Sequence, residues 1–234
     1  MQPTAHSSKD YDADLLALRS RVLEAGGIVE YQIRYAIEAL RTGDRKLIAR
    51  VIADEERVNR LECDIDEACT HIIARRAPAA GDLRLLTMIY KTITDLERIG
   101  DEAKKIALVA REVRLNERLT PGFPEIRMMS TVVIEMLRRA LDGLARLESE
   151  DAPEIARMDR DVDGHFKSIV RQLLTYMIED PRTISPALDL VFVAKALERI
   201  GDHSKNISEY VVYMIKGRDV RHLPIEEMEQ VARA

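Results

Sequence analysis

Eight acidic residues of the chain form four pairs in which the two acids lie four positions apart. The pairs are Glu62 with Asp66, Glu97 with Asp101, Asp159 with Asp163, and Glu198 with Asp202. On a helix, residues four positions apart share a face, so each pair would present two carboxylates together. Carboxylate oxygens suit Mg²⁺, Mn²⁺ and Ca²⁺, and iron also accepts them. The eight acids are therefore candidate metal ligands.

A single acidic pair also has a simpler explanation. Charged residues make up 33% of the chain, and charged helical faces are usually exposed to solvent. Arginines next to the pairs, with Arg98 and Arg199 as candidates, would neutralise the carboxylates without a metal. From spacing alone, metal binding and an arginine network explain the pairs equally well.

The pairs recur because part of the sequence is repeated. The six residues LERIGD begin at Leu96 and again at Leu197, and residues 59–66 resemble residues 156–163. Residues 33–40 also loosely resemble residues 137–144. Such self-similarity indicates an internal duplication. If the two helices that carry the pairs lie side by side, each half of the chain gathers four carboxylates into one patch.

Apolar residues at helical spacing predict helices throughout the chain. We expect six long helices and a short one from residue 223 onward, the six covering residues 11–40, 44–76, 82–115, 125–147, 153–178 and 185–216. Few aromatic residues (4%) and no tryptophan also suit helices packed on helices. We predict an all-α fold of two tandem three-helix bundles. The sequence Pro-Gly-Phe-Pro at 121–124 divides them, which gives residues 1–118, with a polar N-terminal tail, and 119–234.

Glycines interrupt two of the predicted helices. Gly26 and Gly27 each cost about 1 kcal/mol relative to alanine, so the pair is tolerable if packing or a close helix approach compensates. Gly100 lies within the apolar stripe of its helix, where the missing side chain would let a neighbouring backbone come close.

Several functional classes are disfavoured. A net charge of −5 argues against non-specific binding to nucleic acid or to an anionic membrane. We expect a cytoplasmic protein without membrane insertion, since residues 1–10 contain no signal-peptide core and no apolar run is long enough to span a bilayer. Cys63 and Cys69 lie six positions apart on one predicted helix, so we expect no disulfide between them.

Enzymatic signatures are also missing. The sequence contains no G-x-G-x-x-G, Walker, G-x-S-x-G or H-E-x-x-H motif. Di-iron carboxylate enzymes require Glu-x-x-His on two helices, and none of the five histidines has a glutamate three positions before it. We therefore expect no catalytic residues and a protein that is not an enzyme.

The two copies of the repeat differ at their edges. His203 and Asn206 follow the second LERIGD, where the first has Glu102 and Lys105. An imidazole or an amide oxygen could add to a metal site. If metal binds one half more tightly, this difference favours the second.

The repeat also carries a resemblance to a known family. The sequences RRAPAAGDLR (75–84), DLERIGDEAKKIA (95–107) and LERIGDHSKNISEYVVYMIKG (197–217) resemble those of the PhoU family. That family comprises accessory and regulatory proteins of phosphate-specific transport. The resemblance extends from about Leu18 to His222 and implies two three-helix bundles whose acidic motifs hold metal in some members. The eight acids above keep that acidic pattern.

The resemblance also implies a function. It predicts a negative regulator of the phosphate-starvation response that links the Pst phosphate transporter to the PhoR–PhoB two-component system. The expected partners are the transporter ATPase PstB, the sensor kinase PhoR and a second copy of the chain in a homodimer. The expected cofactor is a divalent metal (Mg, Mn, Fe or Zn). A metal-free helical scaffold and, less favourably, a carboxylate-metal enzyme are the alternatives.

Overall fold

The computed structural model describes residues 9–76, 78–112 and 123–234. In these residues the chain forms helices and turns and no strand. The helices are α1 (Lys9–Thr42), α2 (Arg45–Arg76), α3 (Ala80–Glu112), α4 (Phe123–Arg146), α5 (Ala152–Glu179), the 3₁₀ turn η2 (Pro181–Thr183), α6 (Ile184–Lys216) and α7 (Ile225–Arg233). Bounds predicted from the sequence lie within two residues of these, except that the predicted end of the third helix lies outside the described residues.

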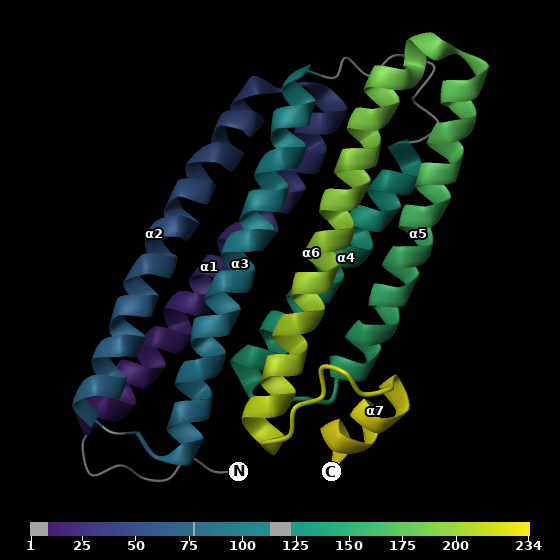
Figure 1. Cartoon of the computed structure of the whole chain (residues 1–234). Coiled ribbons are helices and arrows are strands. Elements are labelled where there is room, and N and C mark those ends of the chain that lie inside the picture. Colours follow the sequence, from purple (N-terminus) through teal and green to yellow (C-terminus); the bar gives the residue numbers. More distant parts are fainter. Residues whose placement is uncertain (1–8, 77, 113–122) are drawn as a thin grey trace.

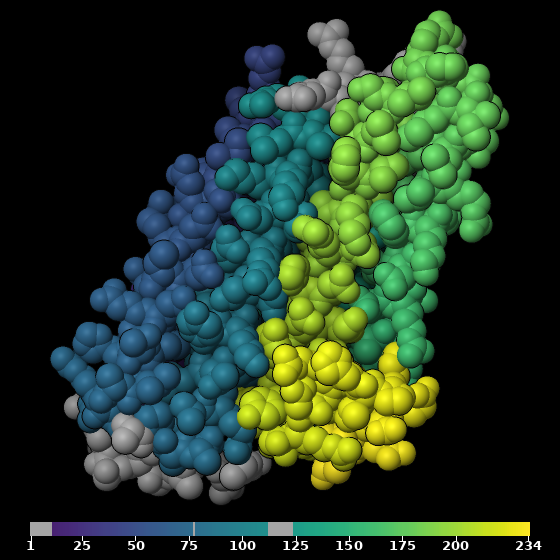
Figure 2. Space-filling view, in the orientation of Figure 1, coloured from purple at the N-terminus to yellow at the C-terminus, as the bar shows by residue number. Residues whose placement is uncertain are grey.

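Helices α1–α3 form one bundle and α4–α6 form a second beside it (Figure 1). Helices α3 and α6 run in opposite directions and pack against each other where the bundles meet, and α1 also contacts α4. Side chains of α3 and α6 meet along the face shown in Figure 2. Helix α7 packs on α5 and α6. The prediction of an all-α fold with two three-helix bundles is confirmed.

The two bundles share one hydrophobic core. A single cluster of buried side chains includes residues of all six long helices, among them Leu96 and Leu197 of the two LERIGD copies. Burial of this apolar area holds the halves together. The proposed division between residues 118 and 119 lies outside the described residues and stays a prediction. In the described residues, no helix is long and apolar enough to cross a membrane.

Gly26 marks a close approach between the two bundles. A Cβ atom at Gly26 would lie 2.6 Å from Cδ1 of Leu141 on α4, whereas a Cβ at Gly27 would meet no atom within 4 Å. Of the two alternatives, a close helix approach exists at Gly26, and Gly27 has none.

This difference predicts opposite effects for two neighbouring substitutions. Gly27→Ala should raise the free energy of unfolding by about 1 kcal/mol, because alanine favours the helix and meets nothing. Gly26→Ala should lower it by about 1 kcal/mol, since Leu141 must move within a packed interface and the helix-propensity gain offsets only part of that cost. Urea denaturation measures both values. Two changes of the same sign would contradict the packing at Gly26.

Gly100 faces a side chain rather than a backbone. A Cβ there would lie 3.1 Å from Oε1 of Gln32 on α1. Gln32 is fully buried, and its Nε2 donates a hydrogen bond to the carbonyl oxygen of Val51 on α2 at 3.1 Å. The expectation of a close backbone approach is thus wrong. Gly100 leaves room for a polar link between α1 and α2.

Candidate carboxylate sites

Packing of α2 on α3 brings the first four acids together. We call Glu62, Asp66, Glu97 and Asp101 the first carboxylate patch. Burial raises the pKa of Glu62, and the charge of Asp66 raises it further. Burial also raises the pKa of Glu97, with added contributions from Asp101 and Glu62. These mutual effects mean that the carboxylates lie close enough to repel one another.

Packing of α5 on α6 gathers the other four acids in the same way. We call Asp159, Asp163, Glu198 and Asp202 the second carboxylate patch. Burial raises the pKa of Asp202, and the charges of Asp159, Glu198 and Asp163 add to the effect. The shift at Asp202 is weakened by water, because its side chain is 51% exposed.

The first patch has no bound counter-charge. None of its four carboxylates forms an ion pair with a lysine, arginine or histidine in the described part of the chain. Arg98 lowers the pKa of Glu62 and Glu97 from a distance, but its nearest acid is Asp95, at 3.9 Å. Oδ1 of Asp66 is buried without a hydrogen-bond partner. Excess negative charge and an unsatisfied oxygen thus leave this patch with less charge compensation than the second patch.

Lysines neutralise the second patch. Nζ of Lys205 lies 2.5 Å from Oδ2 of Asp159, which is only 8% exposed. Nζ of Lys195 lies 2.5 Å from Oε2 of Glu198. Arg199, the candidate from the sequence, instead reaches across to Glu102 on α3, at 3.1 Å. The second patch therefore carries its own cations.

Two substitutions between the repeats explain the difference. The repeat places Lys104 where the second half has Lys205, but Lys104 pairs with Glu55 of α2, at 3.0 Å. The α5 residue that corresponds to Glu55 is Ala152, which cannot hold the lysine. Lys195 corresponds to the uncharged Thr94. The ion pairs thus favour the first patch for a cation, against the preference for the second half drawn from the sequence.

The sequence reading did not identify Lys195 and Lys205 as partners of the acids. Their spacing offered a signal, because each lies three positions from a patch acid and so shares its helical face.

In the described residues, no three Asp, Glu, His or Cys side chains are grouped closely enough to hold a metal ion.

His203 lies at the contact between the two bundles. Its Nδ1 is 2.7 Å from Oδ1 of Asp95 on α3. The ring is therefore engaged with α3 rather than with the second patch.

Both cysteines have free thiols, as expected. Burial raises the pKa of the Cys69 thiol to about 11.

Comparisons with known proteins agree with this architecture. The model of the PhoU domain matches residues 22–110 and again residues 126–211. The chain is 44% identical to the phosphate-specific transport system accessory protein PhoU homolog of Pseudomonas putida, covering 96% of this chain and 88% of that protein. It is 43% identical to the Escherichia coli accessory protein PhoU, covering 97% of this chain and 93% of that protein.

Two solved structures share the fold. The crystal structure of PhoU from Pseudomonas aeruginosa matches with a TM-score of 0.85 and 42% identity, over 89% of this chain and 100% of that one. The PhoU regulatory protein of Streptococcus pneumoniae matches with a TM-score of 0.81 at 24% identity, over 90% of this chain and 99% of that one. The duplicated helical bundles, the doubled acidic motif and these near-full-length similarities show that the chain belongs to the PhoU family.

Proposed function

We propose that this protein is a negative regulator of the phosphate-starvation response and of phosphate uptake. It would act in the cytoplasm as a non-enzymatic adaptor between the Pst phosphate transporter and the PhoR–PhoB two-component system, contacting PstB and PhoR. The observation that carries the proposal is near-full-length similarity to proteins named as accessory to phosphate-specific transport. Because the two bundles share one hydrophobic core, they form one body with enough surface to contact more than one partner.

Deleting the gene tests the regulatory role. Expression of phosphate-starvation genes should rise in phosphate-rich medium and fall again when the gene is restored. Unchanged expression in the deletion strain would reject the proposal. A pull-down with purified PstB and the cytoplasmic part of PhoR then tests the adaptor role separately.

A divalent cation at the first patch is part of the proposal. The support for it is chemical, since Glu62, Glu97 and Asp101 offer oxygens and Asp66 has a buried oxygen without a partner. Binding would require these side chains to come closer together than they lie in the described structure. A bound cation would offset their mutual repulsion. Mg, Mn, Fe and Zn stay open as its identity. Lysine pairing in the second patch supports a metal-free arrangement there.

Thermal unfolding with Mn²⁺ tests the cation. Mn²⁺ should raise the Tm of the wild-type protein through binding to the folded state. The double substitution Glu62→Gln and Glu97→Gln should abolish the rise, whereas the matched change Glu198→Gln and Asp202→Asn should retain it. Without metal, the first variant should also be more stable above pH 4.5, because the folded pKa values of both acids are raised from 4.5. An equal loss in both variants, or no rise in the wild type, would contradict a cation at the first patch.

A further inference from the structure

A cavity between α1 and α2 lies apart from both carboxylate patches. Its volume is about 290 Å³, near the lower limit for small-molecule pockets. Leu18 of α1 and Ile72 of α2, both buried, contribute an apolar floor. The residues that α2 contributes lie on a different face from Glu62 and Asp66, which face α3.

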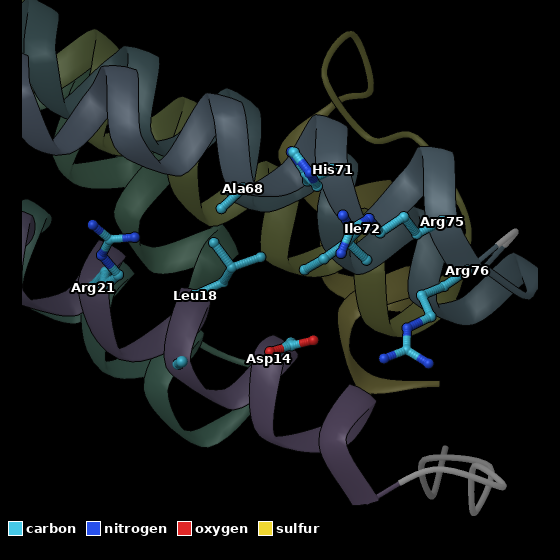
Figure 3. A pocket seen from close by; sticks show the side chains of 9 residues that line it. Asp14, Leu18, Arg21, Ala68, His71, Ile72, Arg75 and Arg76 are labelled. Carbon is cyan, nitrogen blue, oxygen red and sulfur yellow. The ribbon is translucent and has the colours of Figure 1, made fainter.

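Cationic side chains surround this apolar floor. Arg75 and Arg76 extend from α2 and Arg21 from α1, with Asp14 of α1 as an acidic side chain in the cavity wall (Figure 3). Arg21 is paired with Asp64, at 2.9 Å. Neither Arg75 nor Arg76 forms an ion pair or a side-chain hydrogen bond within the described part of the chain. Two guanidinium groups therefore keep their donors available at the rim.

The fold itself does not require this basic cavity. The repeat places Gln172 and Leu173 of α5 where α2 has Arg75 and Arg76, and Glu125 of α4 where α1 has Arg21. The apolar position Ile72, by contrast, recurs as Ile169. Of these positions, the apolar residue at Ile72 is kept in both halves, whereas the three arginines have no basic counterpart in the second half.

We propose that the cavity binds a small phosphorylated molecule with a planar or apolar part, of the size and chemistry of a nucleoside monophosphate. Guanidinium groups bind phosphate oxygens in a bidentate manner, which assigns the phosphate to Arg75 and Arg76. The floor of Leu18 and Ile72 takes the base by apolar contact. The carboxylate of Asp14 accepts hydrogen bonds from ribose hydroxyl or base amino groups. This ligand site is independent of the proposed regulatory function.

Isothermal titration of the full-length protein with adenosine and guanosine monophosphates at about 0.15 M salt tests the site. At least one nucleotide should bind about tenfold or more tightly than the free nucleoside, inorganic phosphate or sulfate, because only the nucleotide uses both the floor and the arginines. Arg75→Ala with Arg76→Ala should weaken binding about tenfold or more. The matched change Arg45→Ala with Arg160→Ala removes two exposed arginines elsewhere and should leave it unchanged.

Other outcomes reject the site. Equal binding of phosphate, sulfate and nucleotide would mean general attraction of anions to arginine. A second outcome is that no nucleotide binds and the Arg75 and Arg76 variant is only less stable than the wild type. These arginines would then stabilise the C-terminal end of α2 and bind no ligand. Equal weakening by both double variants would place the binding elsewhere.

Discussion

Replacing His203 with alanine should lower the free energy of unfolding by about 2–4 kcal/mol. Asp95, the partner of His203, is only 2% exposed, and the two atoms in contact are 2.7 Å apart. The other oxygen of Asp95 is buried without a hydrogen bond, and Arg98 is 3.9 Å away on an exposed side chain. His203→Ala would therefore leave a buried carboxylate with the Tyr210 hydroxyl as its main remaining polar neighbour, which is a costly change.

A double-mutant cycle separates this effect from lost packing. Asp95→Asn combined with His203→Ala should recover part of the loss, because the buried charge is gone. His165→Ala on α5 is a suitable control, since that half-buried ring forms no ion pair or hydrogen bond with any residue that the structure describes. Urea denaturation of the four proteins gives the comparison. Similar losses for His203→Ala and His165→Ala would refute the role of the Asp95 contact.

This contact matters because it joins the two halves of the duplication. His203 follows Asp202 of the second patch directly, and its partner Asp95 lies two residues before Glu97 of the first. The pair between Arg199 and Glu102 crosses between the same two helices. The residues of these two contacts between α3 and α6 thus lie within two positions of the carboxylates of both patches.

Glu209→Gln should stabilise the protein at high pH and leave it unchanged at low pH. Glu209 is 4% exposed, and burial raises its pKa from 4.5 to about 7. The folded state thus holds the proton more tightly than the unfolded state, so stability present below pH 4.5 is lost as the pH rises through about 7. The difference between these pKa values corresponds to about 3 kcal/mol. Glutamine remains neutral and avoids the loss.

Stability measured from pH 4 to pH 8.5 tests this expectation. The difference between the variant and the wild type should grow from near zero at pH 4 to at most about 3 kcal/mol at pH 8.5. The control Glu227→Gln changes an exposed glutamate on α7 and should show little growth. A constant difference across the range would mean that the glutamine acts through packing rather than through charge.

The helices, their duplication and the grouping of the acids could be predicted from the order of residues. Helical periodicity is local, so Val58, Ile65 and Ile72 indicate a buried face without knowledge of what covers it. The doubled LERIGD, with the matching acids of the preceding helices, was enough to predict that each half gathers four carboxylates. It was also enough to indicate the family.

Which cations reach those acids, and how the halves meet, depends on tertiary packing. A lysine side chain can turn toward several neighbours. Because α2 packs on α3, Lys104 forms an ion pair with Glu55, whereas the corresponding Lys205 forms one with Asp159. His203 and Arg199 lie next to patch acids in sequence but point to α3, because helical neighbours one position apart face different directions. The choice of partner depends on distances between residues far apart in the chain, which the order of residues does not specify.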